Sequence, residues 1–219
     1  MKKSFKKLSE GVTRAVSLFF SSPSFRLHLS LFGGMIMNFL YLAGNISSVF
    51  INRNLWSATV TFYHMILLII RSYLLSARRL ESESERARRV CLRVGIFLLF
   101  LDIAASVMMV YTVRRGYSMN LSGIVLLGFV CYTAYSLTSS VLGMKKWAND
   151  NKPLHFAARN MTLAAALTSV FNLQYSLLTT IGAPSDRIDG IIALGGFLVF
   201  FVNILLAIRL IVKNTVRID

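Results

Sequence analysis

The hydrophobic and polar positions of the chain alternate on a long scale, with six apolar runs separated by short polar connectors. Each run holds about 20 residues, which is the length that an α-helix needs to cross a bilayer. The connectors hold about 4 to 15 residues, too few for a second folded domain. The pattern predicts an all-α fold, a polytopic membrane helix bundle with six transmembrane helices. We place its spans at residues 29–51, 55–77, 91–113, 121–144, 158–181 and 188–212.

The segment before the first span has a different pattern. Its apolar residues recur at helical spacing with lysines on the other face, which is typical of a helix lying on a membrane surface. These apolar residues are Phe5, Leu8, Val12, Val16, Phe19 and Phe20. A solvated basic tail is the alternative. We therefore divide the chain into a basic amphipathic segment (1–28), a transmembrane domain (29–213) and a short tail (214–219).

The chain has a net charge of +15, and the positions of its basic residues indicate the membrane topology. Of the 24 lysines and arginines, all but Arg53, Arg114, Arg115 and Arg187 fall on the side that holds both termini. Because cytoplasmic loops carry the excess of Lys and Arg, both termini are predicted to be cytoplasmic. We expect a multi-pass protein of the cell membrane that contacts anionic lipids with its basic cytoplasmic segments. Charge that follows the topology in this way argues against nucleic-acid binding.

Several polar residues interrupt the apolar spans and form a candidate polar path or coupling site. Asp102 is the only one of the nine acidic residues that lies deep in a span. A carboxyl group at that depth is unfavourable and is a functional candidate by default. His64 lies at similar depth, so the two residues could pair. The candidate set is Asn38, Asn45, Tyr63, His64, Asp102, Asn172 and Gln174. The alternative is that these groups are hydrogen-bonding contacts between helices.

Other reactive side chains give weaker signals. Arg71 lies nearer the cytoplasmic end of the second span, where we expect its long side chain to snorkel to the interface. Cys91 and Cys131 show neither metal-ligand spacing nor a disulfide framework. The sequence has no paired carboxylates, no Ser/His/Asp set and no His/Glu metal motif, so we expect no enzymatic activity and no cofactor.

The fifth span opens with the stretch PLHFAARNMTLAAALTS, which is rich in small residues. Small side chains let membrane helices approach each other closely. We therefore expect the rest of the chain to be organised around this helix.

The last two spans carry a resemblance to a known family. The stretch NKPLHFAARNMTLAAALTS, a Gly-Ala-Pro connector and RIDGIIALGGFLVFFVNILLAIRLIVKN resemble the last two membrane helices of the cation diffusion facilitators. In that family the fifth helix carries a His and, four residues on, an Asp, and the sixth begins near an Asp-Gly and ends in a basic cluster. The resemblance implies six helices, cytoplasmic termini, a possible homodimer and a transport function.

The departures from the family concern its metal site. The family builds a tetrahedral site from two ligand pairs on the second and fifth helices, which correspond here to Tyr63 with Leu67 and Met161 with Ala165. None of these four is a normal zinc ligand, and a shift of one residue would supply only His64. The family's cytoplasmic metal-binding domain has no counterpart in the sequence, which ends at Asp219.

Two classes of function follow for a membrane protein that resembles this scaffold without its metal site. One is a small transporter-like protein with a substrate other than zinc. The other is a non-transporting binding or regulatory partner in the membrane, or the substrate-binding subunit of a larger importer.

Overall fold

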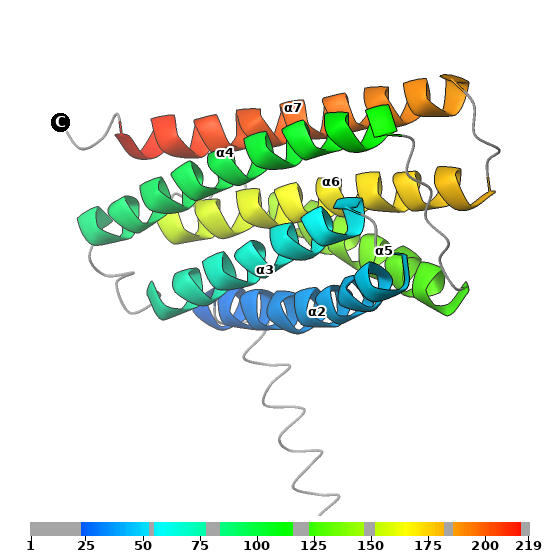
Figure 1. Ribbon diagram of the computed structural model, residues 1–219. Coiled ribbons are helices and arrows are strands. Elements are labelled where there is room, and N and C mark those ends of the chain that lie inside the picture. The colour runs from blue at the N-terminus through cyan, green and yellow to red at the C-terminus, as the bar shows by residue number, and fades with distance from the viewer. Residues whose placement is uncertain are drawn as a thin grey trace, which may run out of the picture.

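Six long helices build the part of the chain that the structure describes (Figure 1). The structure is a computed structural model, and it describes residues 23–52, 55–77, 84–115, 123–146, 152–181 and 186–215. The helices are α2 (Pro23–Asn52), α3 (Leu55–Ser76), α4 (Ser84–Arg115), α5 (Gly123–Lys146), α6 (Pro153–Ile181) and α7 (Asp186–Thr215). The predicted all-α bundle is confirmed. The surface helix predicted within residues 1–22 lies outside the described residues.

Each predicted span coincides with one helix, and the differences are mainly at the N-terminal ends. α2 and α6 begin at Pro23 and Pro153, before the apolar runs, because proline suits the first position of a helix. α4 begins at Ser84 rather than in the apolar run, and Glu85 and Arg89 form an exposed i,i+4 ion pair at 3.7 Å in its first turns. Hydrophobicity marks the part of a helix that crosses lipid, whereas the helix itself continues into the interface.

Four of the described helices are long and apolar enough to cross a membrane. They are Leu55–Ser76 of α3, Glu85–Arg115 of α4, Pro153–Thr180 of α6 and Arg187–Thr215 of α7. In α5 the apolar stretch is shorter, Leu126–Leu142. Large apolar side chains such as Phe50, Phe100 and Leu127 are exposed on the outside of the bundle, as lipid-facing residues are. The protein is therefore a membrane protein.

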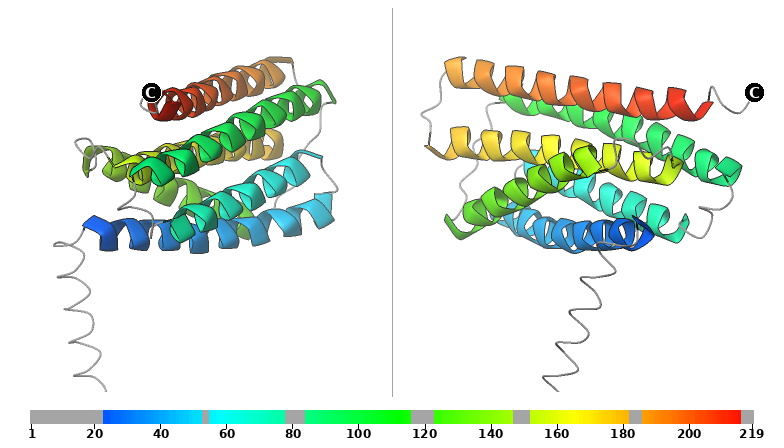
Figure 2. Two further views of the ribbon diagram at one scale, coloured as in Figure 1. Left: turned by 90° about the vertical axis from the view of Figure 1, so that its left-hand side faces the viewer. Right: turned by 180° about the vertical axis from the view of Figure 1, so that it is seen from behind.

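α6 lies at the centre of the bundle. It contacts all five other helices, with α4 and α7 on one side and α2 and α3 on the other (Figure 1). α5 crosses α6 at an inclined angle (Figure 2). Of the residues in the apolar window of α6, 56 % are buried, the largest share among the four candidate spans. Buried alanines, including Ala157, Ala164 and Ala165, permit this close packing.

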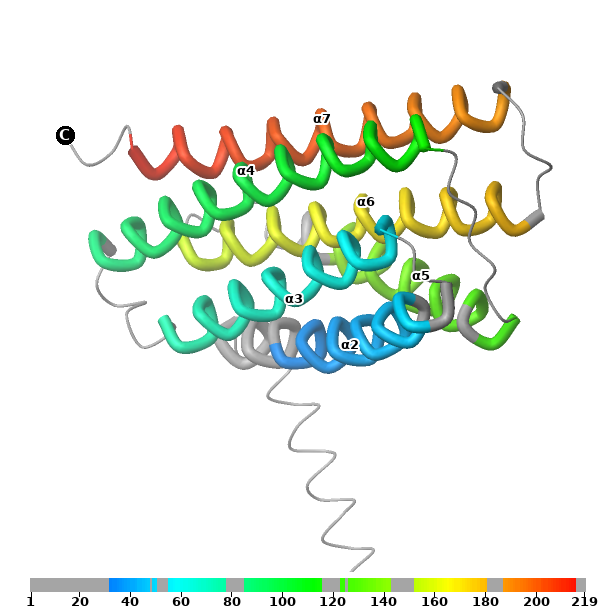
Figure 3. The backbone as a smooth tube through the Cα atoms, in the orientation of Figure 1, coloured from blue at the N-terminus to red at the C-terminus, as the bar shows by residue number. Residues whose placement is uncertain are grey.

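Consecutive helices run in opposite directions (Figure 3). Most basic residues of the described helices therefore fall at one end of the bundle, with Arg114, Arg115 and Arg187 at the other. The start of α4 and the end of α7 bring Arg86, Arg89 and Arg209 to this basic end. On α6 and α7, Arg159, Arg209 and Lys213 approach the ring of Phe156 at 5.3, 5.5 and 4.0 Å. The uneven distribution of basic residues along the sequence thus gives the bundle one basic end, which the positive-inside rule predicts to be cytoplasmic.

This orientation can be tested with single cysteines in a background lacking Cys91 and Cys131. We expect Asn54→Cys, Tyr117→Cys and Ser185→Cys, in connectors at the end opposite the basic one, to react with an impermeant maleimide applied outside the cell. Asn151→Cys should react only after the membrane is permeabilised. The opposite labelling pattern would invert the topology.

Candidate functional site

The buried carboxyl group of Asp102 on α4 is bonded to a tyrosine of α3. The Tyr63 hydroxyl donates a hydrogen bond of 2.9 Å to Asp102 Oδ1. Both side chains are inside the bundle, and Asp102 is 0 % exposed. Within the described residues Asp102 Oδ2 has no hydrogen-bond partner. The pair therefore has one satisfied oxygen and one that is open to a donor.

Two further polar side chains complete this acidic cluster, which we define as Tyr63, Asp102, Thr168 and Asn203. Asn203 Nδ2 on α7 donates to Thr168 Oγ1 on α6 at 3.1 Å. Asn203 also lies beside the Asp102 carboxyl group, and Thr168 lies beside the Tyr63 hydroxyl. Asn203 Oδ1 has no donor among the described residues. Each member comes from a different helix, so the cluster ties α3, α4, α6 and α7 together.

A second group, the aromatic cluster, consists of Tyr41, His64, Phe129 and Tyr132. The Tyr41 ring centroid lies 4.1 Å from that of Tyr132, 4.4 Å from that of His64 and 4.9 Å from that of Phe129. His64 is fully buried, and neither of its ring nitrogens has a hydrogen-bond partner in the described part of the chain. Buried polar groups normally have a partner in the protein or in ordered water. The imidazole is therefore an unsatisfied polar group inside the bundle.

Asparagines connect the aromatic cluster to the centre of the bundle. Asn172 on α6 accepts a hydrogen bond of 3.0 Å from Trp56 Nε1 and donates one of 2.5 Å to the Tyr41 hydroxyl. The Tyr132 hydroxyl donates to Asn38 Oδ1. Asn45 Nδ2 donates to the backbone oxygen of Tyr41 at 2.9 Å. The bonds of Asn172 and Asn38 cross between helices, as polar contacts in membrane bundles do, whereas the Asn45–Tyr41 bond lies within α2.

The structure places six of the seven residues predicted from the sequence in two buried groups, with Tyr63 and Asp102 in the acidic cluster and the other four in or bonded to the aromatic cluster. Gln174 is the exception, because its Nε2 donates to the backbone oxygen of Ile191 and its side chain lies against Gly195 of α7. His64 and Asp102 do not pair. Neighbouring residues of a helix point about 100° apart, so Tyr63 faces Asp102 while His64 faces the aromatic cluster.

The expectation that Arg71 snorkels to the interface is wrong. Its side chain is only 3 % exposed. The guanidinium lies against Gly34 of α2, where an added Cβ would be 1.5 Å from Arg71 Nη1. Two adjacent glycines, Gly33 and Gly34, were a signal in the sequence for such a close approach.

Sequence reasoning left several members of the polar core out of the candidate set. Trp56, Tyr41 and Tyr132 have polar atoms at the ends of otherwise apolar rings, so their burial shows only in the structure. Thr168 follows a run of alanines, and Asn203 is an asparagine inside an apolar span. The position of Asn203 was a signal for an interhelical hydrogen bond.

The positions that correspond to the family's metal ligands lie in the core. Tyr63, Leu67, Met161 and Ala165 are all buried, at 1 % exposure or less. Among the described residues, no three His, Cys, Asp or Glu side chains form a group that could hold a metal ion. Zinc is bound by Cys, His, Asp and Glu side chains, so this donor set does not suit it.

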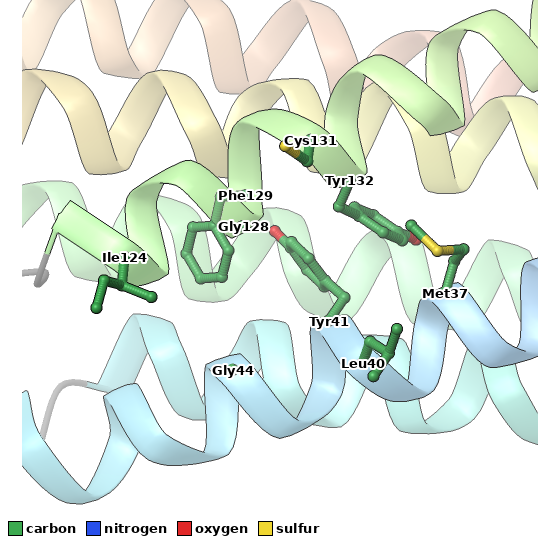
Figure 4. Close-up of a pocket in the computed structure, with 9 residues that line it drawn as sticks. All are labelled: Met37, Leu40, Tyr41, Gly44, Ile124, Gly128, Phe129, Cys131 and Tyr132. Carbon is green, nitrogen blue, oxygen red and sulfur yellow. The ribbon is translucent and has the colours of Figure 1, made fainter.

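An apolar groove of about 340 Å³ lies between α2 and α5 (Figure 4). Its walls are Met37, Leu40, Tyr41 and Gly44 of α2 and Ile124, Gly128, Phe129, Cys131 and Tyr132 of α5. Tyr41 and Tyr132 belong to the aromatic cluster, so the groove borders the polar core. Its outer edge is open, since Leu40 is 59 % and Ile124 is 85 % exposed.

Comparisons of the chain with protein-family models, curated proteins and solved structures found no match. The function is therefore inferred from the residues of the polar core.

Proposed function

We propose that the protein is a small transporter-like membrane protein that moves a solute other than zinc, and that the acidic cluster is its binding or coupling site. The observation that carries this proposal is the pair of unfilled acceptors at the centre of the bundle. Asp102 Oδ2 and Asn203 Oδ1 belong to neighbouring side chains and have no donor within the described residues. A proton on the carboxyl group, a water molecule or a donor group of a solute would fill the gap.

The chemistry of Asp102 suits a coupling role. An acidic side chain at the centre of a membrane helix is unfavourable by about 2.5–3.5 kcal/mol on insertion scales, and such residues mark proton and substrate pathways. When Asp102 is ionised, its carboxylate accepts a hydrogen bond from the Tyr63 hydroxyl. When Asp102 is protonated, its carboxyl group can itself donate a hydrogen bond to a neighbouring acceptor. Gain or loss of one proton therefore changes the hydrogen bonds between four helices.

The resemblance to cation diffusion facilitators supports the same location. In that family the substrate lies between the second and fifth helices, which resemble α3 and α6 here. Tyr63 stands at one of the family's ligand positions and is a member of the acidic cluster. In our proposal the metal ligands are replaced by a tyrosine–carboxyl pair, which suits a proton or a hydrogen-bonding solute.

The test is proton-coupled transport by the purified protein in liposomes that contain a pH-sensitive dye. A panel of alkali cations, divalent cations, amino acids and carboxylic acids is applied with an inward proton gradient. We expect Asp102→Asn to slow any coupled flux at least about tenfold, because the amide keeps the shape but cannot ionise. Tyr63→Phe should have a smaller effect, since one hydrogen bond is worth about 0.5–1.5 kcal/mol. Asp189→Asn, near the start of α7, is the control and should leave the flux unchanged.

One observation favours the non-transporting alternative. Trp56, Asn172 and Tyr41 satisfy one another across three helices, as a purely structural network would. If no member of the panel drives flux, and Asp102→Asn retains the melting temperature of the unmodified protein, the transport proposal fails. Co-purification of a stoichiometric membrane partner would then support a regulatory protein or an importer subunit.

A further inference from the structure

Arg71 on α3 is a buried cation that has no counter-ion among the described residues. Within the described residues no carboxylate lies within ion-pair distance of its guanidinium, and its Nε has no hydrogen-bond acceptor. A buried charge is strongly unfavourable unless it is paired and hydrogen-bonded. The site therefore calls for an anion that the described residues do not supply.

The groups near Arg71 come from two helices, α2 and α5. Gly34 of α2 leaves room for the guanidinium, and the hydroxyl groups of Tyr132 and Tyr135 on α5 are close enough to interact with it electrostatically. Tyr135 Oη also lies 3.4 Å from the position of a Cβ at Gly33. Asn38, which accepts from Tyr132, has an amide Nδ2 without a partner in the described part. The Asn38 amide and the Tyr135 hydroxyl are donors, which is what an oxyanion requires.

The apolar groove between α2 and α5 begins beside these polar groups. Tyr132 is common to both, because it lines the groove and faces Arg71. Met37, one turn from Gly34, also lines the groove near Tyr132, and Ile124 lies at its far end (Figure 4). Along α2 the groove extends from Met37 to Gly44, about 10 Å at 1.5 Å per residue. The polar groups near Arg71 thus adjoin one end of an apolar groove whose outer edge is open.

We propose that one anionic phospholipid binds between α2 and α5, with its phosphate on the Arg71 guanidinium and an acyl chain in the groove. Arg71 lies about 7 Å from the end of α3 at the basic end, which is near headgroup depth. The acyl chain enters through the open outer edge. This site is separate from the acidic cluster and does not depend on the proposed transport function.

The experiment is native mass spectrometry of the detergent-purified full chain, titrated with phosphatidylglycerol or phosphatidylcholine. We expect one phosphatidylglycerol per chain, bound about tenfold more tightly than phosphatidylcholine. Arg71→Gln should weaken phosphatidylglycerol binding about tenfold or more, because a charge-assisted contact is lost. Arg93→Gln removes an exposed arginine at the same end and should change the affinity less than about twofold. Wild-type affinity in Arg71→Gln would overturn the proposal.

A second variant tests the acyl chain and keeps the proposal falsifiable if Arg71→Gln fails to fold. Gly128 lines the groove, and a Cβ there meets nothing within 4 Å. Gly128→Phe therefore adds a ring at the wall of the groove and should also weaken phosphatidylglycerol binding about tenfold. Unchanged phosphatidylglycerol binding in this variant would show that the acyl chain does not lie in the groove.

Two other occupants give different results. If Arg71 binds a free anion, inorganic phosphate will raise the melting temperature of the unmodified protein and of Gly128→Phe equally. Phosphatidylglycerol will then bind no better than phosphatidylcholine. If a second copy of the chain covers the groove, Gly128→Phe will convert a dimer to a monomer while lipid retention stays the same. Either result would overturn the phospholipid assignment.

Discussion

Phe171→Ala is expected to lower the free energy of unfolding by about 3–5 kcal/mol, the range for phenylalanine truncation in a packed core. Phe171 is 0 % exposed on α6 and lies between two aromatic neighbours. Its ring centroid is 5.3 Å from that of Trp56 on α3 and 5.7 Å from that of Phe200 on α7, both edge-on. Truncation removes the contacts of three helices at once, and lipid cannot enter the cavity that is left.

The measurement is unfolding by sodium dodecyl sulfate in mixed micelles. Phe100→Ala is the matched control, because Phe100 is 69 % exposed on the outer face of α4 and loses only lipid or detergent contacts. Its effect should stay within about 0.5 kcal/mol. Equal effects of the two substitutions would mean that α6 does not occupy the centre of the bundle.

Gly95→Leu is expected to destabilise the bundle by about 1–3 kcal/mol through overpacking. Gly95 lies where α4 contacts α7, and an added Cβ would be 2.9 Å from Ile211 Cγ1 and 3.3 Å from its backbone nitrogen. Because one of these atoms belongs to the backbone, a side-chain rotation cannot relieve the clash, and α4 and α7 must separate. The same detergent titration measures the loss.

The control for this substitution is Gly128→Leu on α5, where an added Cβ meets no atom within 4 Å. Glycine in a helix is less favourable than leucine by up to about 1 kcal/mol, so this change should be neutral or slightly stabilising. If Gly95→Leu were as stable as Gly128→Leu, the close contact of α4 with α7 would be contradicted.

The helices could be predicted from the sequence because burial in lipid requires long apolar runs. The central position of α6 could be predicted too, since its alanines permit close contact on several sides. The positions of the helix ends were harder to predict from the sequence. The first turns of α4, which carry Glu85 and Arg86, are polar and leave no hydrophobic signal, although they are good helix formers.

The polar core could be predicted only in part. Buried asparagines and Asp102 stand out against an apolar span, and all but Gln174 of the predicted residues belong to one of the two buried clusters or bond to one. Their partners depend on the rotation of each helix about its axis, which a one-dimensional pattern does not fix. This is why Asp102 bonds Tyr63 rather than His64, and why Arg71 turns inward toward Gly34.

The central position of α6 has a consequence for the order of assembly. Ribosomes make α2 to α5 first, yet each of these helices has α6 as a neighbour in the finished bundle, and α4 has its most extensive contact with α7. At roughly 5–20 residues per second, the 29 residues of α6 and the 30 of α7 take several seconds to synthesise. During this interval Asp102 lacks Asn203, and the early helices can form only a loose set. The bundle therefore reaches its final packing only after α6 and α7 have been made.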